Sequence, residues 1–443
     1  MPPVPLGADL STAILPLATL RDAHGRVARD LRVSLTDRCN LRCSYCMPAE
    51  GLQWLPTPDI LTDAEVVRAI AVAVGRLGVR KVRFTGGEPL LRRGLAGIIA
   101  GVAALRTDEG QPPELSLTTN GVGLDRHLDE LVRAGLDRVN ISLDSLDRQR
   151  YASLARRDRL WDVLASLAAV EAVGLRPIKV NTVVMRGVNE ADVVPLAEFC
   201  LTHGYRLRFI EQMPLGPRHG WDRGRMVPAD EILASLSEHY ELTPAPQRGS
   251  APAQDWLVGA AGCHPSGRIG VIASVTAPFC AACDRTRLTA DGQLRNCLFS
   301  HAETDLRTPL RAGADDAELA ALWVGAHRDK AVGHGIGSAG FQQPARPMPC
   351  PAALSRWAPN HKAANSASSA PARSGVRRSV SEWLNRQLRS CPSAVSRVRS
   401  QAVQNGAVTE AITPIRPDGW QPAAPTSQSC AGAEPRWGAG VSS

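Results

Sequence analysis

Hydrophobic and polar positions follow a repeating pattern along this chain from residue 31 onward. Short runs of apolar and β-branched residues are each followed by a helical stretch. The six short runs, which we interpret as strands, span residues 31–35, 81–85, 115–119, 138–143, 178–184 and 206–211. Strands that alternate with helices favour parallel βα units, which close or partly close into a barrel with its chemistry at the carboxyl ends of the strands.

The stretches between the strands carry helix boundary signals. Thr62 and Glu65 have the spacing of a capping box, which predicts a helix start, and Gly78 is placed to end that helix. Three further helices are expected to end in the same way, at Gly135, Gly174 and Gly204. The pattern predicts four parts: a lead-in over residues 1–30, a barrel over 31–245, a smaller domain over 246–348 and a tail over 349–443.

Three cysteines, Cys39, Cys43 and Cys46, follow the first expected strand at spacings that let one loop surround a compact inorganic cluster. Iron–sulfur clusters are normally held by four cysteines, but the next cysteine here is Cys200. Three thiolates would leave one iron open to a ligand that is not protein. Zinc is the alternative, although it prefers paired cysteine arms or a histidine, and no histidine lies within residues 32–51.

A second group, Cys280, Cys283 and Cys297, lies in the expected smaller domain. A lone Cys-x2-Cys usually indicates zinc. The third cysteine, again without a fourth nearby, favours a second cluster with an open iron. The adjacent Cys263-His264 pair keeps a zinc site open as the alternative.

The formal net charge of +8 belongs almost entirely to the tail. Residues 349–443 hold 11 Lys and Arg against 4 acidic residues, so the rest of the chain is close to neutral and its charge argues against a nucleic-acid partner. Clustered cysteines without a signal sequence indicate a reducing compartment. No apolar run approaches the roughly 18 residues of a membrane span, and we expect a cytoplasmic protein with no membrane partner.

The first cysteine group, with the aromatic Tyr45 before its last cysteine, resembles the signature of the radical S-adenosylmethionine superfamily. The segment Thr85-Gly-Gly-Glu-Pro89 is similar to that superfamily's glycine-rich turn. With both cysteine groups in view, residues 28–348 resemble the GTP 3′,8-cyclase family of molybdenum cofactor biosynthesis. The segments that carry this resemblance are LRVSLTDRCNLRCSYCMP, KVRFTGGEPLLRR, TTNG, NISLDSLD, KVNTVVMRGVN, LRFIEQMP and FCAACDRTRLTADGQLRNCLF.

The resemblance implies an α/β fold: a partial (β/α)6 barrel of the radical S-adenosylmethionine type and a smaller C-terminal iron–sulfur domain. It implies two [4Fe-4S] clusters, one on each cysteine group, and S-adenosylmethionine as cosubstrate. The implied contacts to the cosubstrate are Tyr45, Gly87, Ser142 and Met213. The implied contacts to GTP are Arg32, Arg83, Thr118, Lys179, Arg285 and Arg287, with Arg285 and Arg287 also carrying the catalytic role.

The implied reaction begins with reductive cleavage of S-adenosylmethionine to a 5′-deoxyadenosyl radical. That radical takes the ribose 3′ hydrogen of GTP, and the carbon radical attacks C8, which gives (8S)-3′,8-cyclo-7,8-dihydroguanosine 5′-triphosphate. The implied partners are an electron donor and a downstream pterin-forming enzyme, and a homodimer stays open.

The tail departs from the family, whose members normally end shortly after the position of Met348 at a Gly-Gly pair that reaches into the active site. This chain continues for 95 residues rich in Ser, Ala, Pro and Arg, a composition that predicts disorder. We interpret the tail as the product of a shifted reading frame, which puts the activity of this copy in doubt. The alternative is a genuine basic extension that binds an acidic partner or nucleic acid.

Two other functions stay open from the sequence alone. The first is a radical enzyme with an accessory cluster that acts on a peptide or another substrate. Arg285 and Arg287 beside Cys283, together with Lys179 and Arg83, favour a polyphosphate over a peptide. The second is a non-catalytic, zinc-stabilised binding protein with a basic tail.

Overall fold

The computed structural model describes residues 18–216, 221–246, 248–259, 266–336, 338 and 341–344. All of them belong to the first of two compact units, Met1–Ser396. The expected tail over 349–443, most of the lead-in and the Cys263-His264 pair lie outside the described residues. Among the described helices, none is long and apolar enough to cross a bilayer.

A single sheet of mixed direction forms the centre of the fold. Its strands run in the order β12-β11-β10-β1-β2-β3-β4-β5-β6-β9-β8-β7, and every pairing from β10 to β9 is parallel. The strands are β1 (Asp30–Ser34), β2 (Lys81–Thr85), β3 (Glu114–Thr119), β4 (Arg138–Ser142), β5 (Lys179–Val184), β6 (Arg206–Glu211), β7 (Leu242–Pro244), β8 (Gln254–Val258), β9 (Gly267–Ile272), β10 (Arg285–Leu288), β11 (Gln293–Arg295) and β12 (Thr304–Asp305).

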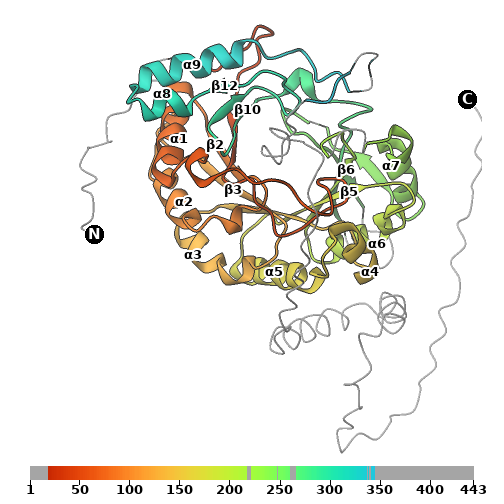
Figure 1. Ribbon diagram of the computed structural model, residues 1–443. Coiled ribbons are helices and arrows are strands. Elements are labelled where there is room, and N and C mark those ends of the chain that lie inside the picture. Colours follow the sequence, from red (N-terminus) through yellow and green to blue (C-terminus); the bar gives the residue numbers. More distant parts are fainter. Residues whose placement is uncertain are drawn as a thin grey trace, which may run out of the picture. The chain divides into compact units, whose positions relative to one another are not determined.

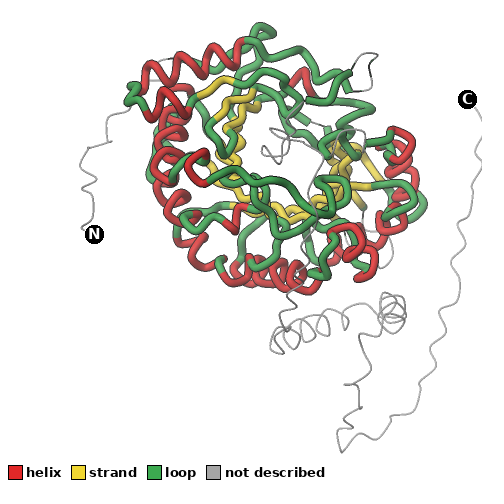
Figure 2. Tube along the Cα trace, in the orientation of Figure 1, coloured by secondary structure: helices red, strands yellow, loops and turns green. Residues whose placement is uncertain are grey.

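Helices surround the strands on the outside, as Figures 1 and 2 show. They are α1 (Asp63–Leu77), α2 (Leu95–Ala103), α3 (Leu128–Arg133), α4 (Arg148–Ala155), α5 (Leu160–Val173), α6 (Val193–Thr202), α7 (Ala229–Ser237), α8 (Arg307–Arg311) and α9 (Asp316–Arg328). The expected capping box is present, since Thr62 Oγ1 accepts from the Glu65 amide while the Glu65 side chain accepts from the Thr62 amide. Gly78 ends α1 in the left-handed conformation, with φ of 71°.

All six expected strands are confirmed, but the sheet is wider than expected. The part of the chain that follows β6 adds β10 beside β1 and β9 beside β6, both parallel, so it extends both edges of the same sheet. This pairing could not be read from the sequence because β10 lies some 250 positions from β1. The expected domain boundary between residues 245 and 246 stays a prediction.

Side chains alternate between two sides along each parallel strand. In β1 and β2, Leu31, Val33, Val82 and Phe84 are fully buried in the hydrophobic core. The intervening arginines line an interior cavity. Register then aligns them: Arg32 is the partner of Arg83 on one side and of Arg287 on the other, so the three lie in one row across three strands.

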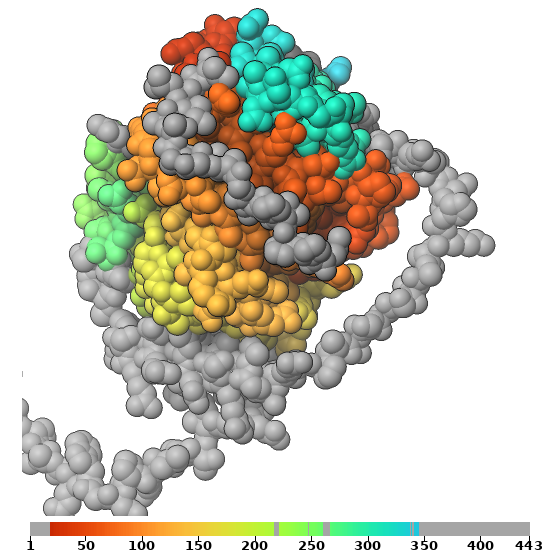
Figure 3. Space-filling view, turned by 90° about the vertical axis from the view of Figure 1, so that its left-hand side faces the viewer, coloured from red at the N-terminus to blue at the C-terminus, as the bar shows by residue number. Residues whose placement is uncertain are grey.

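Helix α9 lies beside α1, and Figure 3 shows the turquoise α8–α9 segment against the orange-red α1 region. Arg68 on α1 donates to the carbonyl oxygen of Ala314 and pairs with Asp316. From within α9, Nε1 of the buried Trp323 donates to Oγ1 of Thr286 at 2.9 Å. The helix is therefore fixed behind β10, and the chain that leaves it returns to the second cysteine group.

Glu211, at the end of β6, joins three segments through one buried carboxylate. Its oxygens accept from the amide of Ala229 at 2.8 Å and from the amides of Val275 and Thr276 at 2.7 and 3.0 Å. The Thr276 hydroxyl donates to it as well. These bonds hold the start of α7 and the turn after β9 against β6.

We predict that Glu211→Gln lowers the free energy of unfolding by about 1.5–3 kcal/mol, because an amide puts N–H donors against backbone N–H donors and removes charge-assisted bonds. Chemical denaturation of the full chain measures the loss. Glu231→Gln is the matched control, since Glu231 forms an exposed ion pair with Arg186, and such pairs contribute about 1 kcal/mol or less. Equal losses in the two variants would contradict the anchoring role of Glu211.

Candidate active site

The first cysteine group lies on the loop that follows β1, at the carboxyl end of that strand. Cys39, Cys43 and Cys46 are all half-buried. The Leu41 amide donates to the Cys39 sulfur at 3.5 Å, and Nδ2 of Asn120 lies 3.9 Å from the same sulfur. Donors directed at a sulfur favour its thiolate form.

These three thiols interact with one another. Burial, followed by the charges of Asp144 and the two neighbouring cysteines, raises the pKa of the Cys43 thiol well above its ordinary value. Burial also raises the pKa of Cys39. Thiolates brought this close need a shared positive charge, and the iron ions of a cluster are the kind of centre that supplies it.

Tyr45 ties this loop to the neighbouring strands. Its hydroxyl donates to Oδ2 of the buried Asp144 at 2.8 Å, and Oδ1 of Asp144 accepts from the Val183 amide at 2.9 Å. Burial raises the pKa of Asp144 to about 6, because the carboxylate is withdrawn from water. The cysteine loop is thus fixed to the carboxyl end of β4 and to β5.

The glycine-rich turn after β2 packs directly on the cysteine loop. The Gly87 amide donates to the Thr36 carbonyl at 2.8 Å, and the Glu88 amide donates to the Arg38 carbonyl at 2.7 Å. A Cβ on Gly87 would lie 2.2 Å from the Arg38 carbonyl oxygen. No side chain fits there, so the close approach of these two loops requires glycine.

Glu88 extends this contact to a third loop. Its fully buried carboxylate accepts from the Thr119 hydroxyl at 2.7 Å and from the Asn120 amide at 2.8 Å. Burial raises its pKa to about 7, although these donors oppose the rise. The loops after β1, β2 and β3 therefore form one hydrogen-bonded assembly, a connection that the spacing of the Gly-Gly-Glu-Pro segment did not reveal.

The second cysteine group lies across the interior. Cys280 starts a short 3-10 helix before β10, Cys283 follows it, and Cys297 follows β11. Burial alone would raise the pKa of the Cys283 thiol. The charges of Lys330 and Arg285 are the largest of the opposing effects, which together lower this pKa below its usual value. Burial raises the pKa of Cys280, and the charges of Cys297 and Cys283 add to that rise.

These cysteines line one side of a cavity whose other walls come from the barrel strands. Its charged lining is cationic: five arginines and no carboxylate face it among the described residues. The arginines are Arg32, Arg83, Arg208, Arg285 and Arg287. Thr118, Asn181, Met213, Asn296 and His334 are among its polar and apolar lining residues.

Crowded positive charge is the dominant electrostatic feature of this cavity. Burial and the nearby Arg32 lower the pKa of Arg83 well below its ordinary value, and the same two causes lower that of Arg287 to about 10. Asp30 shows the reverse effect, because neighbouring arginines outweigh burial and lower its pKa to about 2. An anion entering the cavity would relieve this repulsion.

The two expected catalytic arginines differ in how firmly they are held. Arg285 donates to the Ser250 carbonyl at 3.0 Å, has Nε 3.8 Å from Oδ2 of Asp30, and lies over the Phe279 ring at 4.6 Å. Arg287 is half-buried, and its Nε, like that of Arg285, has no hydrogen-bond partner among the described residues, but Arg287 has no counterpart of the bond from Arg285 to Ser250. Arg287 therefore has more donor capacity left for a ligand.

The structure brings most of the sequence-predicted substrate residues together and leaves one apart. Arg32, Arg83, Thr118, Arg285 and Arg287 all line the cavity. Lys179 begins β5 two positions before the lining residue Asn181, so it lies on the same side but deeper. Burial, and then the nearby Arg208, lower its pKa to about 7.

Of the residues predicted to contact the cosubstrate, only Met213 lines this cavity. Tyr45 and Gly87 are on the loops after β1 and β2, and Ser142 is the last residue of β4, opposite Asn181. The four roles stay predictions.

Sequence reasoning missed Asp30 and Lys330, and it gave Arg208 no role in binding a ligand. Arg208 had a usable signal, since it takes the same alternating position in β6 that Arg83 takes in β2. Asp30 lies two positions from its partner Arg32, but its interactions with Arg83 and Arg285, like that of Lys330 with Cys283, involve residues that are distant in sequence.

Both cysteine groups fit an iron–sulfur cluster in their donor chemistry. In the described part of the chain, no three His, Cys, Asp or Glu side chains are grouped as a single-ion site. The fit rests on three clustered thiols at each site and, at the second, on a buried ammonium 3.4 Å from the Cys283 sulfur.

We predict that Tyr45→Phe lowers the free energy of unfolding by about 1–3 kcal/mol, because it leaves a buried oxygen of Asp144 without its donor. Tyr151→Phe is the matched control, since the Tyr151 hydroxyl is buried without a hydrogen-bond partner among the described residues. Its removal should be neutral or stabilising. Denaturant midpoints of the two variants test this, and an equal loss in both would show that the bond to Asp144 contributes nothing specific.

The chain matches known protein families and known relatives. Residues 33–200 match the model described as the radical SAM superfamily, and residues 205–336 match the model described as molybdenum cofactor synthesis C. A Corynebacterium glutamicum protein named GTP 3′,8-cyclase is 63% identical over 74% of this chain and 88% of its own length. A Mycolicibacterium smegmatis protein of the same name is 55% identical over 77% of this chain and 93% of its own.

Among solved structures, that of Streptococcus suis SuiB bound to S-adenosylmethionine aligns with 68% of this chain and 69% of its own at 15% identity, with a TM-score of 0.42. The Corynebacterium and Mycolicibacterium relatives are far more similar in sequence, over 88% and 93% of their own length. The chain belongs to the GTP 3′,8-cyclase family of radical S-adenosylmethionine proteins.

Proposed function

We propose that this protein cyclises GTP to (8S)-3′,8-cyclo-7,8-dihydroguanosine 5′-triphosphate, an early step of molybdenum cofactor biosynthesis. The observation that carries the proposal is the cavity with five arginines and no facing carboxylate, bordered by the second cysteine group. A nucleoside triphosphate brings several negative charges and needs several cations, and guanidinium groups bind phosphate oxygens in pairs.

The residues of the first site would hold a [4Fe-4S] cluster and S-adenosylmethionine. Cys39, Cys43 and Cys46 would be the ligands, which would leave one iron for the cosubstrate. The Tyr45 hydroxyl is already bonded to Asp144, so its contact with the cosubstrate uses the ring or the backbone. When bound, the cluster and cosubstrate supply reductive carbon–sulfur cleavage and abstraction of the ribose 3′ hydrogen.

The residues of the second site would orient GTP for that abstraction. Cys280, Cys283 and Cys297 would hold the second cluster, which would supply an open iron as a binding position for the guanine. Arg32, Arg83 and Lys179 neutralise the triphosphate, and Thr118 adds a hydroxyl. Arg287 binds the substrate directly, while Arg285, fixed by Ser250 and Phe279, keeps the adjoining wall in place. Such positioning is the protein's share when a cofactor performs the difficult step.

The proposal includes the wider setting of the reaction. An electron donor must reduce the first cluster, and a pterin-forming enzyme must consume the product. We place the reaction in the cytoplasm, where iron–sulfur clusters meet a reducing environment. We also propose that the barrel and the smaller domain divide between residues 245 and 246, and that the protein forms a homodimer.

An anaerobic assay of the cluster-reconstituted full chain with S-adenosylmethionine, a reductant and GTP tests the function by measuring 5′-deoxyadenosine. We expect release that depends on GTP and a nucleotide product with the mass of the cyclised compound. Release without dependence on GTP would assign another substrate, such as a peptide. Zinc in place of iron and sulfide would overturn the radical chemistry altogether.

Lys179 provides a test of the cationic cavity. We predict that Lys179→Met weakens GTP binding about 10- to 100-fold, which corresponds to about 1.4–2.8 kcal/mol. Lys81→Met is the matched control, because Lys81 also begins a parallel strand but is exposed. Calorimetric titration of GTP into the two variants measures the difference.

The same lysine predicts a pH dependence. Its pKa in the free protein is lowered to about 7, and a bound polyanion favours its charged form. GTP binding above pH 7 must therefore take up a proton, and wild-type affinity should fall as pH rises beyond that value. The fall should be shallower in Lys179→Met, and parallel pH profiles would contradict the assignment.

A further inference from the structure

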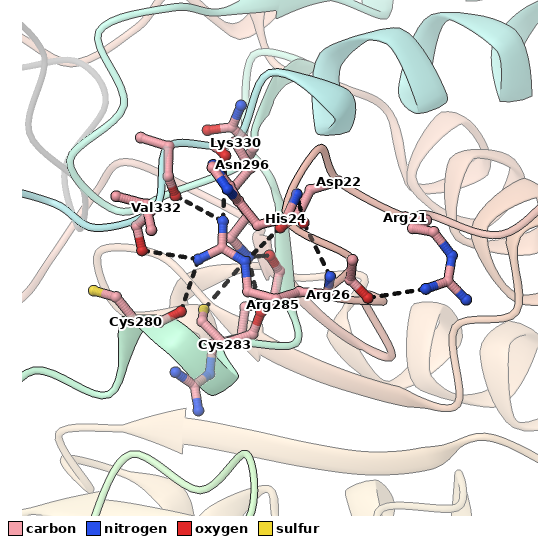
Figure 4. A network of polar contacts seen from close by, with 12 residues as sticks. Arg21, Asp22, His24, Arg26, Cys280, Cys283, Arg285, Asn296, Lys330 and Val332 are labelled. Carbon is pink, nitrogen blue, oxygen red and sulfur yellow. Dashed lines mark hydrogen bonds and ion pairs between the residues drawn. The ribbon is translucent and has the colours of Figure 1, made fainter.

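Lys330, two residues beyond the end of α9, reaches the second cysteine group from behind. Its Nζ lies 2.7 Å from the Arg285 carbonyl oxygen, 3.2 Å from the Cys283 carbonyl oxygen and 3.4 Å from the Cys283 sulfur. Figure 4 shows it above Cys283 in a network with Arg26 and Asp22. An ammonium has three N–H donors and no acceptor, and here all three have an acceptor, an arrangement that favours the charged form against the opposing effect of burial.

This ammonium has no ordinary counter-ion. The residue is 3% exposed, and no carboxylate lies within ion-pair distance among the described residues. A buried charge without a partner costs several kcal/mol. The remaining candidate is the Cys283 sulfur, which compensates the charge only as a thiolate, the state in which it would bind iron.

Arg26 holds the same segment in place. Its guanidinium donates to the Cys280 carbonyl at 2.7 Å, and to the carbonyls of Lys330, Ala331 and Val332 at 3.2, 2.7 and 3.0 Å. Asp22, whose side chain is fully buried, accepts from Nε of Arg26. Figure 4 shows this guanidinium between Val332 and Cys280. The position of Lys330 is therefore fixed from both sides.

We propose that Lys330 is a positioning residue of the second cluster, which sets its charge and raises its reduction potential through the hydrogen bond to the Cys283 thiolate. This rests on the proposed function, because it requires a cluster on Cys280, Cys283 and Cys297. Hydrogen bonds to the sulfurs and nearby charge are established determinants of cluster potential. A positive charge next to the cluster stabilises the reduced state, which carries one more electron.

The test is a redox titration of the second cluster alone, followed by electron paramagnetic resonance. The full chain carries Cys39→Ala, Cys43→Ala and Cys46→Ala, so that only the second cluster contributes. In this background we compare Lys330→Met, which removes the charge and the donor, with Lys330→Arg, which keeps both. Lys81→Met is the matched control, since it removes one lysine charge from an exposed strand position.

We expect Lys330→Met to bind iron and sulfide but to show an about tenfold lower ratio of reduced to oxidised cluster at a fixed potential, which is about 59 mV for one electron. Lys330→Arg should stay within about twofold of the parent, and Lys81→Met should match it. Loading of the arginine variant but not the methionine variant would also support the charge requirement.

Three results would overturn the proposal. If Lys330→Met binds the cluster and the ratio of reduced to oxidised cluster is unchanged, then Lys330 only holds two carbonyl groups in place. If both Lys330 variants change the ratio of reduced to oxidised cluster equally, or if neither binds iron, then the shape of the side chain matters and its charge does not. A parent background that binds no iron would refute the second cluster itself, whereas inactive but iron-loaded protein would count against the proposed function only.

Discussion

Positive charge concentrated along one row of strands is the constraint on which the site depends. Arg287, Arg32 and Arg83 form one row because their strands are parallel and in register. Like charges in such a row repel one another, and Asp30 provides a nearby carboxylate whose pKa Arg32, Arg83 and Arg285 hold at about 2. The core on the other side of the strands supplies the stability that keeps these charges together, and the cavity that they line suits an anion.

The loops at the carboxyl ends of the strands behave as one body. Gly87 and Glu88 bond to the cysteine loop, Glu88 bonds to the loop after β3, and Tyr45 bonds to Asp144 after β4. Reaction at a radical centre requires that the two reacting carbons stay in contact distance. Interlocked loops meet that requirement better than independent ones, because no single loop can move without breaking bonds to another.

Much of this arrangement follows from local sequence. The six strands and the capping box were predicted because alternation and cap spacing are local signals, and the cysteine spacings predicted both sites. Lys330 and the pairing of β10 with β1 were not, because each depends on residues that are distant in the chain. Asp30 was missed because Arg83 and Arg285, which add to the effect of its neighbour Arg32, are also distant. Arg208 is an intermediate case. The alternation of side chains along the strand applies to Arg208 as it does to Arg83, but it predicts a cavity position only once the side of the strand that faces the cavity is known.

The pairing of β10 with β1 also fixes an order of events during synthesis. Strands β1 to β6 are complete when residue 211 has been made, but β10 begins only at residue 285. At about 5–20 residues per second, β1 has an open edge for roughly 4 to 15 seconds beyond the exit of β6. Throughout that interval its backbone N–H and C=O groups are unpaired on one side, and an unpaired edge is a template for joining another chain. The first cysteine loop follows this edge strand directly, so it too is complete before β10 covers the edge.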